Sequence, residues 1–92
     1  MDIMDRLEQM EEYIIEELEG AEKYAKLYCD MIDIDSSSAK EFKTMAMQEL
    51  DHAEMLCKLT EHLELDEAMM MAHKILKKRN YKEIARVKEM LE

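Results

Sequence analysis

The sequence contains no proline and no tryptophan, and its single glycine is Gly20. Turns, β-hairpins and phosphate-binding loops depend on glycine and proline, so these absences exclude an all-β fold, a Rossmann unit and a P-loop. Hydrophobic residues make up 48% of the chain and charged residues 39%, which is typical of helices and not of disordered segments. We therefore expect an all-α protein whose chemistry is carried by side chains on helices.

Basic residues are also scarce. Lys and Arg number 13 against 23 Asp and Glu, and the resulting formal net charge of −10 opposes a phosphate backbone, so nucleic acid is not an expected partner. The sequence has neither an apolar run of about 18 residues nor a signal-peptide pattern, so no membrane association is expected. We expect a cytoplasmic protein in which Cys29 and Cys57 are reduced thiols.

The first two thirds of the chain read as a helical hairpin. Apolar residues recur every three or four positions from Ile3, which predicts a first helix that ends at about Ile32. The polar cluster that follows predicts a turn, and Ser38 with Glu41 three residues later fits a capping box that would start a second helix. Because the turn is short, the two helices are expected to run antiparallel over about 2–64.

A C-terminal helical segment is expected over about 66–92, within one domain that spans 1–92. Asp66 is a candidate N-cap for this segment. Its predicted apolar face contains Met69, Ala72, Ile75 and Leu76. The cationic stretch before Asn80 allows either two helices or one that continues to the C-terminus, and we favour a break near Asn80.

Three polar residues occupy positions on the predicted apolar stripes. Glu17 lies on the stripe of the first helix, and Glu49 and His52 lie on the stripe of the second. A buried carboxylate without a partner is costly, so polar residues at these positions require an explanation. In an antiparallel hairpin with this turn, facing residue numbers add up to roughly 70, which places all three residues at one height.

The spacing of these residues indicates a metal site. Glu49 and His52 form a Glu-x-x-His pair on one helix face, and carboxylate with imidazole suits iron or manganese, while zinc also fits. Di-iron helical bundles use one Glu from each of two helices and a Glu-x-x-His from each of the other two. The chain carries half of that set. A homodimer, or a higher even-numbered oligomer, would supply the other half as a four-helix bundle that holds two ions per dimer.

The segments EELEGAEKY, from Glu16 to Tyr24, and ELDHA, from Glu49 to Ala53, resemble the paired motifs of ferritin-like di-iron proteins such as bacterioferritin and rubrerythrin. The short chain with one hairpin most resembles encapsulated ferritin. That resemblance implies a ferroxidase that oxidises Fe(II) to Fe(III) with O2, for iron storage or detoxification. It also implies that Glu17 and His52 are terminal ligands of iron and that Glu49 bridges the two ions.

The resemblance implies further roles on the first helix. Tyr24 matches a tyrosine near the metal site, and Glu16 and Glu19 match an outer site through which iron enters. Each residue also has a simpler reading: Tyr24 as a core aromatic, and the two glutamates as part of a solvated face. His62 and His73 lie off the stripes and are expected on the surface. No C-terminal segment resembles an encapsulin-targeting tail, so an encapsulin shell is not an expected partner.

Two other classes of function remain open at this point. One is a metal-binding module that holds iron, manganese or zinc without turnover. The other is a metal-free helical oligomeric scaffold in which Glu and His set the register through buried polar pairs. Metal uptake and Fe(II) oxidation distinguish these classes from a ferroxidase.

Overall fold

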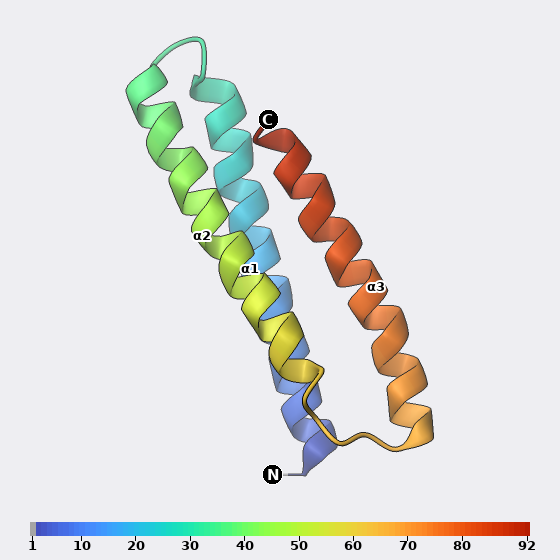
Figure 1. The fold of residues 1–92 in the computed structure, drawn as a ribbon. Coiled ribbons are helices and arrows are strands. Elements are labelled where there is room, and N and C mark those ends of the chain that lie inside the picture. Colours follow the sequence, from blue (N-terminus) through green and yellow to red (C-terminus); the bar gives the residue numbers. More distant parts are fainter. Residues whose placement is uncertain (1) are drawn as a thin grey trace.

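A computed structural model describes residues 2–92, which form three helices and, over that range, no strand (Figure 1). The helices are α1 (Ile3–Met31), α2 (Ser36–Thr60) and α3 (Glu67–Met90). The all-α prediction is confirmed. The molecule is elongated, 51 × 22 × 15 Å, because a helix of 29 residues alone is about 43 Å long. None of the described helices has a stretch that is both long and apolar enough to cross a membrane.

A short turn joins α1 to α2 and makes them antiparallel, as the sequence predicted (Figure 1). The capping-box prediction is wrong, because α2 begins at Ser36 and its N-cap is Asp35. The Asp35 carboxylate accepts hydrogen bonds from the Ser38 backbone N–H at 3.2 Å and from the Ser38 hydroxyl at 2.7 Å. These charge-assisted bonds hold the pKa of Asp35 below its usual range. A charged acceptor three residues earlier thus takes the role predicted for Ser38.

Small residues form the contact between α1 and α2. Four alanines in this contact have no exposed surface: Ala21, Ala25, Ala46 and Ala53. Larger buried residues such as Ile14 and Leu50 complete the core. Because alanine ends at Cβ, the two helix backbones approach closely here, and side chains at the edge of the contact reach across from one helix to the other.

The buried stripe of α2 is offset by one residue from the predicted one. Sequence reasoning placed Met45, Glu49 and His52 on the core seam, whereas the buried positions are Ala46, Leu50 and Ala53. Glu49 is half-buried and His52 is exposed. The prediction followed the large apolar residues, but the close helix contact is made by small ones. The predicted seam therefore lies at the border of the core.

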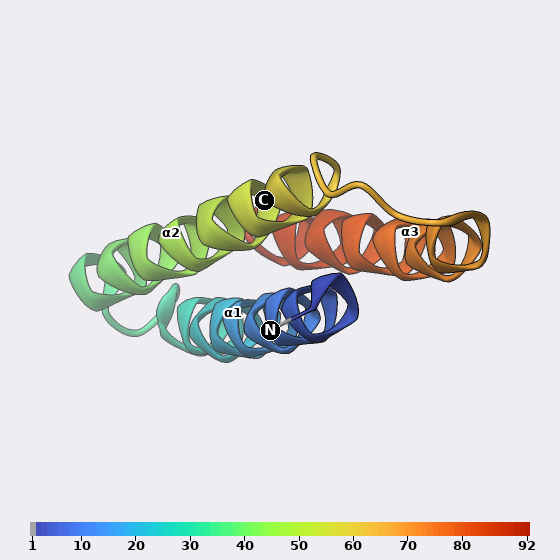
Figure 2. The ribbon, with the colours of Figure 1, turned by 90° about the horizontal axis from the view of Figure 1, so that it is seen from below.

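Helix α3 packs along the hairpin, and the end view in Figure 2 shows the three helices in a three-cornered arrangement. Asp66 is its N-cap and accepts a hydrogen bond from the Met69 backbone N–H, as predicted. The predicted break near Asn80 is wrong, because α3 continues without interruption to Met90. The Asn80 side chain turns inward and donates a hydrogen bond to Glu11 at 2.9 Å, so a residue read as a helix end is a buried one.

The apolar face predicted for the first half of α3 is also wrong. Ala72 and Ile75 are exposed, and the buried positions there belong to His73 and Asn80. The second half buries Ile84 and Val87 against the hairpin. Ion pairs fasten the helix further, with Arg86 3.1 Å from Glu22 of α1 and Lys77 2.7 Å from Glu61 at the end of α2. The first half of α3 thus packs through polar groups.

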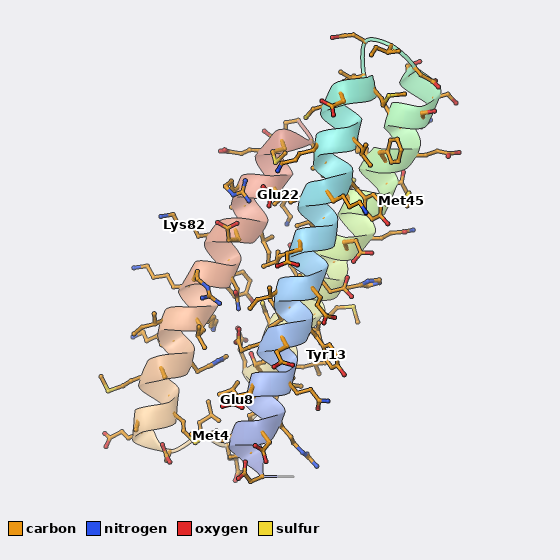
Figure 3. All side chains as sticks on the ribbon, turned by 180° about the vertical axis from the view of Figure 1, so that it is seen from behind. Met4, Glu8, Tyr13, Glu22, Met45 and Lys82 are labelled. Carbon is orange, nitrogen blue, oxygen red and sulfur yellow. The ribbon has the colours of Figure 1, made fainter. Side chains whose placement is uncertain are left out.

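One side of the hairpin is left uncovered by α3. Figure 3 shows Tyr13 and Met45 on the side of the hairpin away from α3, whereas Glu8 and Glu22 point toward it. Tyr13 and Met45 are 47% and 38% exposed, and Leu59 continues the same row on α2 at 50%. We call this uncovered side, marked by Tyr13, Met45 and Leu59, the open face.

The alanine contact gives the first testable prediction. Ala46→Leu adds bulk where α1 and α2 touch, and overpacking of this kind costs about 1 to 3 kcal/mol of unfolding free energy. Urea unfolding followed by circular dichroism measures this loss. The matched control is Ala85→Leu at an exposed position of α3, which should change stability by less than about 0.5 kcal/mol. Equal stability of the two variants would contradict the close contact.

Candidate metal centre

The structure brings together the three residues predicted as metal ligands. Glu17 comes from α1, and Glu49 and His52 come from successive turns of α2. One ligand atom from each of the three lies within 4.8 Å of the others. Nδ1 of His52 lies 3.4 Å from Oε2 of Glu17. The hairpin alone therefore assembles two carboxylates and one imidazole at one point.

This cluster sits at the edge of the core and opens to the uncovered side. The side chain of Glu17 is 28% exposed and that of His52 is 57% exposed, while Glu49 is half-buried. Tyr13 lies one helical turn before Glu17, and Met45 lies one turn before Glu49, so the cluster belongs to the open face. Apolar side chains therefore flank it on both helices.

The only glycine of the sequence faces the cluster. A Cβ atom placed on Gly20 would lie 3.4 Å from Oε2 of Glu49. This distance is an ordinary van der Waals separation, so the Glu49 carboxylate packs directly against α1 at Gly20, and an alanine would also fit there.

The proximity of the two carboxylates raises the pKa of Glu49. The largest cause is a hydrogen bond that its acid form makes with the Glu17 carboxylate. Partial burial and repulsion by the Glu17 charge act in the same direction, and His52 opposes them. A cation between the two carboxylates would relieve the repulsion between their charges.

The donor set fits a divalent transition metal. Oε2 of Glu17 is buried and has no hydrogen-bond partner among residues 2–92, and it lies 3.4 Å from Nδ1 of His52, so it is available to a cation in the cluster. Carboxylate oxygen and imidazole nitrogen are the ligands of iron, manganese and zinc in proteins. Ligands about 2.1 Å from one ion are separated from each other by about 3 to 4 Å, and the spacing in the cluster is close to that range.

The other residues that the resemblance singled out lie outside the cluster. Tyr24 is partly buried and packs against the hydrophobic core, and no hydrogen bond among residues 2–92 connects it to the three ligands. Glu16 and Glu19 are exposed on α1. Glu19 borders a shallow groove beside α3 together with Glu22 and Arg79. Their proposed roles in the passage of iron remain predictions.

Sequence reasoning missed a second polar cluster between α1 and α3. It contains Glu11 and His73, of which His73 was expected on the surface but is 8% exposed. On the first helix, Glu11 is separated from the apolar residues Ile15 and Leu18 by four and seven positions, which are spacings of one helix face. On the third helix, His73 lies seven residues before Asn80. The seven-residue spacing from His73 to Asn80 was a usable signal, because residues so spaced share a helix face.

The two cysteines are unpaired, as expected. Cys57 is buried in the core, and desolvation, aided by the charge of Glu11, raises the pKa of its thiol to about 11. Cys29 is exposed, and its thiol donates a hydrogen bond to the Met90 carbonyl at 3.3 Å. Neither thiol contributes to the candidate metal centre.

No family model, no curated protein and no solved structure matches this chain.

The raised pKa of Glu49 predicts how the stability of the metal-free protein depends on pH. A carboxyl whose pKa is higher in the folded state binds its proton more tightly there. Its stabilising contribution is therefore complete below its ordinary pKa of 4.5 and is lost as the pH rises through the folded value. Relative to Glu49→Gln, the unmodified protein should lose stability from about pH 4.5 toward neutral pH.

Thermal unfolding with a chelator present, at a series of pH values between about 4 and 7.5, measures this difference. Glu41→Gln is the matched control, because Glu41 is an exposed carboxylate on the same helix. Its melting temperature should follow that of the unmodified protein at every pH. Parallel curves for the unmodified protein and Glu49→Gln would show that Glu49 is not coupled to Glu17.

Proposed function

We propose that this chain is a ferritin-like di-iron protein that oxidises Fe(II) to Fe(III), with Fe(II) bound by Glu17, Glu49 and His52. The observation that carries the proposal is the convergence of these three ligand atoms within 4.8 Å at the open face. The raised pKa of Glu49 and the unpartnered oxygen of Glu17 support it, because a cation bound at this point would offset the repulsion between the carboxylates and pair with that oxygen. The ligand types favour iron or manganese and also accept zinc.

The proposed centre is completed by a second copy of the chain. Three protein ligands are too few for two ions, and a two-fold axis at the open face would double them. The dimer would then hold two metal ions with four carboxylates, so that four negative charges balance two divalent ions. The exposed Tyr13, Met45 and Leu59 would supply apolar contacts around the ligands. In this arrangement the two hairpins form a four-helix bundle.

The reaction follows from the charge of the ligands. Two Fe(II) ions give up one electron each, and O2 takes both electrons with two protons to yield hydrogen peroxide. Glu17 and Glu49 favour the product, because anionic oxygen ligands stabilise Fe(III) more than Fe(II). Iron competes with protons for the Glu49 carboxylate, whose pKa is raised, so the uptake of iron should weaken as the pH falls. Removal of Fe(III) for storage or detoxification would follow.

Fe(II) oxidation tests the proposal directly. Anaerobic protein loaded with Fe(II) and mixed with air should oxidise iron faster than a protein-free solution, as followed by ultraviolet absorbance. His52→Ala removes one ligand and should lower the rate by about tenfold or more. His62→Ala is the matched control, because His62 is exposed in the connection between α2 and α3. Metal uptake without oxidation would instead indicate a non-catalytic metal-binding module.

The proposed dimer has a separate test. Met45→Lys places a charge in the interface, which costs about 3 kcal/mol and raises the dimer dissociation constant roughly a hundredfold. Met71→Lys on α3 is the control and should leave association unchanged, because Met71 is exposed away from the open face. Sedimentation velocity at several concentrations measures both. Equal association of the two variants would place the interface elsewhere.

A further inference from the structure

Four polar side chains are buried where α1, α2 and α3 meet. Thr60 and Asn80 are 1% and 2% exposed, and the side chains of Glu11 and His73 are each 10% exposed. They come from all three helices, and they occupy the positions where the first half of α3 faces the hairpin. Burial of this many polar groups is costly unless each finds a partner.

The hydrogen bonds fix where the protons lie. The Thr60 hydroxyl donates its only proton to the Cys57 carbonyl at 2.6 Å. Nε2 of His73 lies 3.2 Å from the same hydroxyl oxygen, so this oxygen must accept and Nε2 must carry a proton. The Asn80 amide donates to Oε2 of Glu11 at 2.9 Å. One nitrogen of His73 and one oxygen of Glu11 are thus accounted for.

The two remaining atoms face each other without a partner. Oε1 of Glu11 and Nδ1 of His73 are buried, have no hydrogen-bond partner among residues 2–92, and lie 3.8 Å apart. When the proton on Nε2 is the only one on the ring, Nδ1 presents a lone pair to a carboxylate that also presents lone pairs. Two acceptors at this separation repel each other unless something electrophilic lies between them.

We infer that Glu11 and His73 form a second metal site, which binds a divalent first-row cation such as Zn2+ through Oε1 and Nδ1. A separation of 3.8 Å matches two ligands of one ion at about 2.1 Å. The surrounding bonds are those that metal sites use: a ligating imidazole donates its other N–H to a fixed acceptor, and a ligating carboxylate accepts a bond at its second oxygen. Thr60 and Asn80 provide these two contacts.

Glu11 and His73 border a groove on the surface of the molecule. A groove of about 460 Å³ between α1 and α3 is lined by both Glu11 and His73, and two further carboxylates, Glu8 and Glu12, also line it. These carboxylates make the approach favourable for a cation. Water that enters from the groove would have to fill the remaining coordination positions of a bound ion.

This second site is separate from the cluster at the open face. Glu11 precedes Glu17 by six residues, which is about 9 Å along the helix and about 120° around it. An ion held by Glu11 and His73 would connect α1 to the first half of α3, where polar contacts replace an apolar core. The site therefore does not depend on the proposed ferroxidase function or on a second copy of the chain.

Zn2+ titration in a variant without the first site tests the inference. In Glu17→Gln/Glu49→Gln, isothermal titration calorimetry should find one Zn2+ per chain. His73→Gln or Glu11→Gln added to that background should abolish this binding, and Thr60→Ala should weaken it about 10- to 100-fold. His62→Gln in the same background is the matched control and should bind one Zn2+ per chain. No Zn2+ binding in the background variant, or binding unaffected by His73→Gln, would overturn the inference.

Nitrogen NMR of the histidine rings tests the same site without any substitution. Saturating Zn2+ should give His73 the shifts of a metal-bound Nδ1 and a protonated Nε2. A His73 ring protonated on both nitrogens under these conditions would mean that Glu11 and His73 form a simple ion pair. That result, or a ring spectrum unchanged by Zn2+, would overturn the inference even if the variants fail to fold.

Discussion

The close approach of α1 and α2 is the constraint on which the candidate metal centre depends. Alanines such as Ala21 and Ala46 bring the two backbones together without a layer of large side chains. Glu17 can then reach Glu49 across the contact, and the Glu49 carboxylate packs against α1 at Gly20. The same approach forces two carboxylates together, which explains the raised pKa of Glu49. The close packing of the two helices thus determines the electrostatic interaction between Glu17 and Glu49.

The sequence predicted the hairpin, the N-cap of α3 at Asp66 and the convergence of Glu17, Glu49 and His52, because apolar periodicity and one short turn determine these features. It misplaced the buried stripe of α2, since large apolar residues dominate the pattern while alanines make the contact. It also missed the inward side chains of α3, because Asn80 and His73 are buried only through partners on other helices. Such partnerships are long-range and leave little local signal.

The two clusters of polar side chains lie on two different sides of the hairpin. The cluster of Glu17, Glu49 and His52 opens to the face that α3 leaves uncovered, and the pair of Glu11 and His73 lies beneath α3. Together they contain the buried side-chain atoms that lack a hydrogen-bond partner among residues 2–92. A net charge of −10 makes cations the natural partners of both. A cation bound at each cluster would relieve the repulsion between the acceptor atoms that the fold places close together.

The most direct test of the central claim is the mass of the protein loaded with Fe(II) without oxygen, measured by native mass spectrometry. The account predicts an even-numbered oligomer that holds, for each pair of chains, two more iron ions than Glu49→Gln does. A monomer, or an oligomer with the same iron content as the variant, would contradict a centre shared between two copies.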